Sequence, residues 1–400
     1  MRIARLTDQE KQEIIRFVEA DKPLPDKHRL FLFDEKREED QMGLRYSMKR
    51  GLAFLFALCK WIIILVVTLE VLSFLAITSS NIVIYGHARE GSRAKYDPYT
   101  FFQMAGGVRH TAHNRVSDNP QQNVTIWLFG GSTLRSSSAS PDKTIPGFMA
   151  KMLNDEDATK YFRVINLGVN SFNSLMETKY LQKALIERPV KPDIVIFYDG
   201  ANDAKYFAEH RTPAGHHGYR RARALVESYY RSWFGILKPL NAALYASFTK
   251  ELYDKIHQIG IPLDRDSPEV KELSDVELKR YDYVNKVTRC YGAKFLLVWQ
   301  PMLWTEDCPD EIPQSIKDLE RGFFVNSDRY QVVRNNFAVP YFALKDKLKH
   351  KPYFMEITHV LCTRTSAAYR PDGVHLLDHG REIIARRLVD KVRDLLQETP

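Results

Sequence analysis

One stretch of the chain is apolar at nearly every position. Residues 51–85 carry only two charged side chains, Lys60 and Glu70. A bilayer core needs about 20 mostly apolar residues, so we predict a transmembrane anchor at 51–85, with Trp61–Val83 as the span. Lys60 can reach the near interface beside Trp61, whereas Glu70 falls near mid-span, where a carboxylate faces a partner helix or water. The alternative is a buried helix of a soluble protein.

The residues that flank this anchor predict its orientation. Upstream lie five basic residues and downstream three, namely Lys36, Arg37, Arg45, Lys49 and Arg50 against Arg89, Arg93 and Lys95. The positive-inside rule then places the N-terminus in the cytoplasm and the rest of the chain outside it. Residues 1–50 form a cytoplasmic tail that is too long for a signal-peptide n-region, so the anchor is expected to stay uncleaved. Thr7 and Glu10 have capping-box spacing before a helical pattern at 7–20.

After a polar linker at 86–122, short apolar runs alternate with helical periodicity. The runs are residues 124–132, 162–168, 193–200 and 294–301. Helical patterns occupy 146–153, 174–187 and 275–290. Continuous apolar strands separated by helices indicate a parallel sheet covered on both faces. We therefore predict one three-layer α/β/α domain over residues 123–400, with ligands bound outside the carboxyl ends of its strands.

The composition excludes several classes of protein. In 400 residues the hydrophobic share is 44% and the charged share 27%, which excludes wholesale disorder and a multi-span transporter. The net charge of +8 eases approach to anionic lipid or acidic glycan. Lys and Arg form no stripe interleaved with aromatic residues, so nucleic acid is not an expected partner. No metal cluster and no glycine-rich phosphate loop occurs, so no cofactor is expected.

Candidate chemistry falls at the predicted strand ends. Ser132 follows the first strand within Gly130-Gly131-Ser132-Thr133, on a turn that small residues allow to be tight. Its hydroxyl can project above the sheet there as a nucleophile. Gly168 ends the second run, and Asn202 follows the third within Gly-Ala-Asn-Asp. Their N–H groups, with that of Ser132, can stabilise an oxyanion. Taken singly, each of these is equally an ordinary loop, turn or helix cap.

A histidine and a carboxylate occur together near the C-terminus. Asp372 and His375 are three residues apart before a helical stretch, a spacing that lets the carboxylate orient an imidazole suited to take a serine proton. The alternative without a catalytic role is a capped helix with a surface histidine. Glu356 and His359 repeat the spacing but lack the Leu-x-x-x-Gly and helix that follow His375, so they are the second choice.

Together the blocks GGST (130–133), NLG (166–168), GAND (200–203) and DGVH (372–375) resemble the SGNH (GDSL-type) hydrolase superfamily. The resemblance covers about residues 124–395 and implies a flavodoxin-like α/β/α fold. It also implies Ser132 as nucleophile, His375 as base, Asp372 as its orienter, and Gly168 and Asn202 as oxyanion donors. The first block departs from the namesake Gly-Asp-Ser in a way that many bacterial members share. KYDPYTFF (95–102) is similar to bacterial membrane-anchored members.

Between the third and last blocks lies an insertion at about 205–285. Its histidines, His210, His216 and His217, have no metal-ligand spacing and are expected in a solvated loop. Its aromatic stretch at 225–253 is interpreted as helix packing, with a substrate lid, a membrane-surface contact and a partner-binding face as alternatives.

Three cysteines lie outside the anchor. Cys308 follows the fourth strand and Cys362 precedes the last block, so both can lie on the catalytic rim. In an extracytoplasmic domain we predict a Cys308–Cys362 bridge, with Cys290 as a buried thiol.

The expected function is a membrane-anchored serine esterase that removes O-acyl groups, acetyl in the first instance, from envelope glycan or lipid. One alternative is an O-acyltransferase that works with a multi-span membrane partner through Glu70 or the aromatic insertion. The other is a catalytically silent subunit of a membrane complex that keeps the fold.

Overall fold

The computed structural model describes residues 7–23, 25–85, 94–306, 308 and 312–397. Residues divide into two compact units, 1–71 and 72–400, and each is described by itself. The helices of the N-terminal region are α1 (Asp8–Glu19) and α2 (Asp26–Tyr85). α1 begins with the predicted capping box, in which Thr7 Oγ1 accepts from Glu10 N–H and the Glu10 carboxylate accepts from Thr7 N–H.

α2 contains the apolar stretch. Over Arg45–Ile82 it is long and apolar enough to cross a membrane, and side chains such as Phe54, Phe56 and Trp61 are exposed. Exposed apolar side chains argue against the alternative of a buried soluble helix. The boundary between the two units, after Val71, falls inside the predicted anchor.

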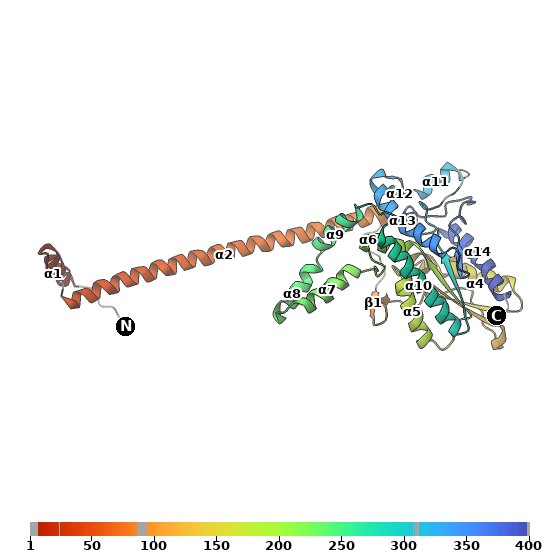
Figure 1. The fold of residues 1–400 in the computed structure, drawn as a ribbon, viewed down its shortest axis with the longest axis horizontal. Helices are drawn as coiled ribbons and strands as arrows, with labels where there is room; N and C mark the ends of the chain where they lie inside the picture. The colour runs from red at the N-terminus through yellow and green to blue at the C-terminus, as the bar shows by residue number, and fades with distance from the viewer. Residues whose placement is uncertain (1–6, 24, 86–93, 307, 309–311, 398–400) are drawn as a thin grey trace. The chain divides into compact units, whose positions relative to one another are not determined.

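A five-stranded parallel sheet forms the centre of the second unit (Figure 1). Its strands are β3 (Asn123–Gly130), β4 (Tyr161–Asn166), β5 (Ile194–Asp199), β6 (Lys294–Trp299) and β7 (Phe354–Glu356). The order β4-β3-β5-β6-β7, with every neighbouring pair parallel, is the doubly wound flavodoxin-like arrangement. The four predicted strands are confirmed, and β7 is an addition that the sequence pattern did not indicate.

Helices cover both faces of the sheet. On one side lie α4 (Ile145–Glu156) and α14 (Asp378–Gln397), and on the other α5 (Ser174–Glu187), α10 (Pro268–Cys290) and α13 (Gln331–Leu348). Successive residues of β3 alternate between the two cores: Ile126 and Leu128 pack with α4 and α14, Trp127 and Phe129 with α5. The predicted three-layer α/β/α class is thereby confirmed.

The remaining elements lie around these layers. They are β1 (Ala94–Asp97), β2 (Phe101–Met104), η1 (Pro120–Gln122), α3 (Ser132–Arg135), η2 (Pro141–Lys143), α6 (Ala201–His210), α7 (Tyr219–Arg231), η3 (Gly235–Leu237), α8 (Lys238–Tyr245), α9 (Phe248–Ile259), α11 (Gln314–Glu320), α12 (Phe323–Asn326) and η4 (Asp328–Tyr330). The predicted insertion at about 205–285 overlaps α10, which packs on the sheet. Its other helices α7, α8 and α9 are additions to the three layers.

The predicted linker is folded over its described part, 94–122. β1 and β2 form an antiparallel hairpin, and Met104 is buried in the core. The Asn114 side chain caps the edge strand β4, donating to Val164 O at 3.0 Å and accepting from Val164 N–H at 2.8 Å. Such pairing satisfies backbone groups that an edge strand leaves open.

The predicted Cys308–Cys362 disulfide is present. The expectation of a buried Cys290 thiol is wrong: Cys290 is a free, exposed cysteine. It is the last residue of α10, two positions after the buried Thr288.

Candidate active site

The turn after β3 positions Ser132. β3 ends at Gly130, and Ser132 is the first residue of α3, so its N–H is among those that a helix leaves without an intrahelical acceptor. Gly131 has an ordinary φ of −79°, so the turn itself does not demand glycine. A Cβ there would lie 2.3 Å from Asn202 Nδ2 and 3.2 Å from Phe172 O. Close approach of Asn202 therefore requires glycine at 131.

Ser132, His375 and Asp372 form a continuous hydrogen-bonded chain. His375 Nε2 lies 2.8 Å from Ser132 Oγ, and His375 Nδ1 lies 2.9 Å from Asp372 Oδ2. Asp372 Oδ1 accepts from the backbone N–H groups of Val374 and His375, each at 2.8 Å. The fold thus brings together three predicted residues that are up to 243 positions apart.

The surroundings of Asp372 keep it charged. Burial alone would raise the pKa of this carboxyl, but hydrogen bonds from the His375 ring and from two backbone N–H groups outweigh burial and lower the pKa below its usual value. An ionised carboxylate only accepts hydrogen bonds, so it holds the imidazole proton on Nδ1. Nε2 is then left as the acceptor for the Ser132 hydroxyl.

Backbone hydrogen bonds define the loop that carries His375. Arg370 N–H donates to His375 O at 2.8 Å, and Leu377 N–H donates to Ala368 O at 2.7 Å. Across the rim, Leu303 N–H donates to Gly373 O at 2.8 Å. The loop over residues 368–377 is therefore tied to itself and to the segment that follows β6.

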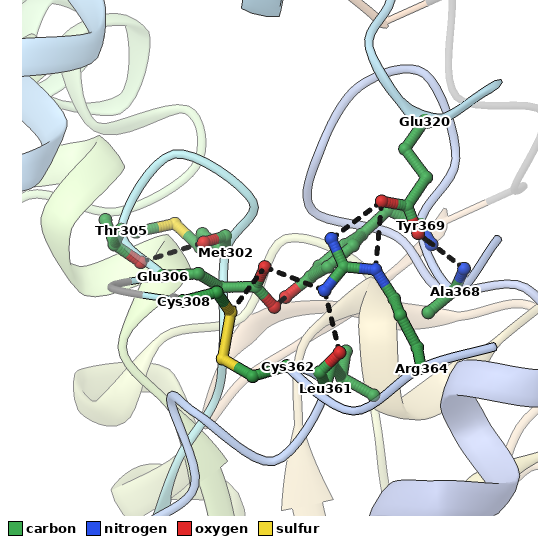
Figure 2. Close-up of polar contacts among 10 residues, drawn as sticks. All are labelled: Met302, Thr305, Glu306, Cys308, Glu320, Leu361, Cys362, Arg364, Ala368 and Tyr369. Atoms are coloured by element: carbon green, nitrogen blue, oxygen red, sulfur yellow. Dashed lines mark hydrogen bonds and ion pairs between the residues drawn. A yellow bond between two sulfur atoms is a disulfide. The ribbon is translucent and has the colours of Figure 1, made fainter. Parts of the chain in front are cut away.

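A buried ionic cluster, centred on Arg364, anchors the start of this loop (Figure 2). Arg364 donates to Glu306 at 3.0 Å and to Glu320 at 2.7 and 3.0 Å. Glu320 Oε1 in turn accepts from the N–H groups of Ala368 at 2.6 Å and Tyr369 at 3.3 Å. These residues, which the sequence analysis missed, fix the backbone a few residues before Asp372.

Glu306 is the unusual member of the Arg364 cluster. It accepts from the Tyr369 hydroxyl, and Cys308 Sγ of the disulfide lies 3.6 Å from its Oε2. Burial, with a smaller effect of the Glu320 carboxylate, raises its pKa to about 7 against the opposing effects of Tyr369 and Arg364. One guanidinium facing two buried carboxylates leaves a net negative charge, which a proton on Glu306 removes.

Asn202, a predicted oxyanion donor, lies beside Gly131 and Phe172. Its Nδ2 donates to Phe172 O at 2.6 Å, which uses one of the two amide protons. The position of Nδ2 beside Gly131 places the second proton next to the Ser132 turn. The side chain is half-buried, and the residue sits in the first turn of α6.

Buried acidic residues form hydrogen bonds near the start of α6. Asp203 accepts from Ser174 N–H at 3.0 Å, and Tyr281 donates to Asp199 at 2.9 Å. Burial and the nearby Asp203 raise the pKa of Asp199 well above its usual value. Burial also raises the pKa of Glu277 to about 7 against the ion pair with Arg280. The hydrogen bond between Ser174 and Asp203 joins the first turn of α6, which carries Asn202, to the start of α5.

Gly168 does not have the predicted role of an oxyanion donor. Its N–H donates to Asn166 Oδ1 at 3.0 Å, and its carbonyl accepts from Arg135 at 2.9 Å. Because Asn166 takes that N–H, Gly168 supports the Ser132 turn from behind instead of offering a proton to an oxyanion. The adjoining segment contacts Asn202 through Phe172, and Ser171 before it holds a left-handed φ of 65°. A serine in that conformation gives no signal in the sequence.

The second acid–histidine pair is engaged elsewhere. Glu356 pairs with Lys345 at 2.8 Å and lies 3.7 Å from His359, whose side chain is half exposed.

Downstream of Ser132, Ser138 accepts from Arg370 at 2.7 Å. The serine-rich loop therefore contributes to the rim through the segment just before Asp372.

Of the insertion histidines, His216 is buried and His210 is half-buried, against the expectation of a solvated loop, whereas His217 is exposed. His216 is buried and stacks on Phe101 with ring centroids 5.4 Å apart, and His217 lies edge-on to Phe102 at 5.6 Å. Burial lowers the pKa of His210 to about 4. The aromatic hairpin β1–β2, which the sequence analysis treated as linker, supplies the rings that cover the loop.

Comparison with known proteins finds similar solved structures. No family profile and no curated protein sequence matches the chain. A carbohydrate acetylesterase from Sinorhizobium meliloti is 19% identical, with 68% of this chain and 99% of that chain covered and a TM-score of 0.33. The M. smegmatis aryl esterase is 18% identical over 68% and 99%, with a TM-score of 0.32. A lipase/acylhydrolase from Enterococcus faecalis is 14% identical over 68% and 96%, with a TM-score of 0.37.

Proposed function

We propose that this chain, an SGNH-type ester hydrolase, is a membrane-anchored serine esterase that removes O-acyl groups from envelope glycan or lipid. The hydrogen-bonded chain from Asp372 through His375 to Ser132 is the observation that carries the proposal. It joins a nucleophile, a base and an orienting carboxylate within hydrogen-bond reach. The same geometry argues against a catalytically silent subunit.

The chemistry proceeds in two acyl-transfer steps. His375 Nε2 takes the Ser132 proton while Oγ attacks the ester carbonyl, and the resulting oxyanion is stabilised by Ser132 N–H and the second Asn202 amide proton. Collapse expels the alcohol, which takes the proton from His375, and leaves an acyl-serine. Water then attacks with His375 as base again, so that the carboxylic acid leaves and Ser132 is restored.

Anchoring and orientation have their own support. The exposed apolar stretch of α2 suits a single span. The Cys308–Cys362 disulfide supports an extracytoplasmic catalytic unit, because disulfides persist in oxidising compartments. The basic residues upstream of the span support a cytoplasmic N-terminus.

Transfer to a sugar hydroxyl is the second candidate. An acyl-serine is resolved by any positioned hydroxyl, and the exposed aromatic face of α7 and α8 offers a surface on which a membrane-embedded acyl donor could dock. Product analysis separates the two functions: free acid marks hydrolysis, and acylated glycan oligomer marks transfer.

The test uses the full chain with p-nitrophenyl acetate and a fluorophosphonate probe. We expect Ser132→Ala to lower kcat by at least about 10³-fold and to abolish probe labelling, which mass spectrometry of the wild type places on Ser132. Ser137→Ala, a change in the same rim loop, is the matched control and should keep both activities. Unchanged hydrolysis by Ser132→Ala would refute the assignment.

A further inference from the structure

The α7–α8 hairpin exposes apolar surface at its tip. Trp233 is 93% exposed, Ile236 82% and Tyr230 77%. Further exposed side chains on α7, the turn and α8 are Leu225, Val226, Tyr229, Phe234, Leu237, Leu240, Leu244 and Tyr245. So large a group of aromatic and aliphatic residues in contact with water marks an interaction surface.

Basic side chains accompany this surface. Residues 219–245 contain five Arg or Lys, at 220, 221, 223, 231 and 238, and a single acidic residue, Glu227. Arg231 and Lys238 stand on either side of the tip at 232–237, and Lys238 Nζ lies 5.1 Å from the centre of the Tyr229 ring. A tip of Trp, Phe, Ile and Leu flanked by cations suits the interfacial layer of an anionic bilayer better than an apolar protein face.

α9 joins the hairpin to the end of the apolar helix. Within the second unit, Phe248 packs edge-on against Phe74 at 5.1 Å, and Ser73 Oγ lies 3.3 Å from Thr249 Oγ1. α9 also contacts α7, since Arg221 pairs with Glu251 at 2.6 Å and lies 4.3 Å from the Phe248 ring centre. The hairpin is therefore connected, through α9, to Ser73 and Phe74 in the part of α2 that belongs to the second unit.

The apolar helix is long enough for this contact to lie near the bilayer surface. Arg45–Ile82 comprises 38 residues, whereas a bilayer core takes about 20. Part of the stretch must therefore lie outside the core. A contact at Ser73 lies near the surface when the span ends before Ser73, further upstream than the Trp61–Val83 span that the sequence predicted. Ser73 and Ile77 are the buried positions, and the polar Ser73–Thr249 contact suits the interface better than hydrocarbon.

We propose that the tip at 232–237, with the adjoining faces of α7 and α8, inserts into the interfacial layer of an anionic bilayer on the catalytic unit's side. The inference rests on the proposed anchoring by α2 and is independent of the esterase chemistry. Because the anchor already confines the hairpin near the membrane, a weak interfacial affinity is enough to keep it inserted. Insertion would hold the catalytic unit against the surface that presents acylated lipid or lipid-linked glycan.

The test places the full chain in nanodiscs of phosphatidylcholine and phosphatidylglycerol with brominated acyl chains. Subtracting the emission of Trp233→Phe from that of the wild type isolates Trp233. We expect the brominated lipid to remove most of this difference signal and aqueous iodide to leave it. Replacing both Arg231 and Lys238 by glutamine should lower the equilibrium constant for insertion into anionic nanodiscs about fivefold for each charge removed.

A matched control and two outcomes decide the proposal. Ile186→Trp in the Trp233→Phe background reports from the exposed end of α5, and it should be quenched by iodide and not by brominated lipid. Iodide quenching of Trp233 would overturn the proposal. Shielding from both quenchers would also overturn it, since protein from a second copy or a partner would then cover the tip. Hydrolysis of p-nitrophenyl acetate by each variant reports the proposed function separately.

Discussion

Replacing Glu306 by glutamine tests the buried Arg364 cluster. The change keeps the shape of the side chain and removes its titration. In the folded protein this carboxyl faces Arg364, Tyr369, Glu320 and Cys308. Its pKa is about 7, against 4.5 for an unperturbed glutamate, because burial outweighs the attraction of Arg364.

The sign of the effect follows from proton binding. A folded-state pKa above the unfolded value means that the folded protein binds the proton more tightly. The associated stability is fully present below about pH 4.5 and is lost as pH rises through about 7. Since one pKa unit corresponds to about 1.4 kcal/mol, the free energy of unfolding of the wild type should fall by about 3 kcal/mol relative to Glu306→Gln across that window.

Urea unfolding of the full chain in detergent, followed by circular dichroism from pH 4 to 8, measures this difference. Other groups, such as Glu277 with a pKa of about 7, titrate equally in both proteins. Their contributions cancel in the difference between the two free energies of unfolding. Glu382→Gln, on the exposed face of α14, is the control and should run parallel to the wild type. Parallel curves for Glu306→Gln and the wild type would refute the reasoning.

Three further predictions concern the site and its support. Asp372→Asn leaves the loop in place but no longer holds the proton on His375 Nδ1, so we expect steady-state kinetics to show kcat lowered about 10⁴-fold with KM little changed; a loss below tenfold would exclude the orienting role. Asn202→Ala should lower kcat about 10²–10³-fold while the fluorophosphonate probe still labels Ser132, and abolished labelling would instead indicate a collapsed site. Removing the disulfide with Cys308→Ser and Cys362→Ser opens a loop of 54 residues and should lower the free energy of unfolding by about 4 kcal/mol in urea titrations, whereas Cys290→Ser should leave it unchanged.

The layers of the fold were predictable because their signals are local. β3, β5 and β6 are continuous apolar runs of strand length, and α5 begins and ends where its periodicity does. The catalytic blocks were predictable because each follows a strand or precedes a helix. Parallel strands bring their carboxyl ends to one edge, so the neighbourhood of Ser132 and Asn202 followed from the strand ends alone.

Features that depend on distant partners gave no local signal. β7 is three residues long, and its pairing with β6 decides its conformation. The segment at 94–122 looked like a linker because its contacts are single side chains, such as Asn114 on β4, and not an apolar run. Glu306 and Glu320 lie 58 and 44 positions before Arg364, with no spacing that distinguishes them from surface charges.

Gly131 shows how a correct prediction can have a different cause from the one assumed. The sequence predicted a tight turn that small residues permit, yet Gly131 has an ordinary φ of −79°. What excludes a side chain is Asn202 Nδ2, 2.3 Å from the Cβ position, together with Phe172 O at 3.2 Å. The glycine of the first block is therefore required by the amide of the third block and by the segment after the second. These three strand ends form one packed unit, and a methyl group at 131 would act on the oxyanion donor before it acted on the turn.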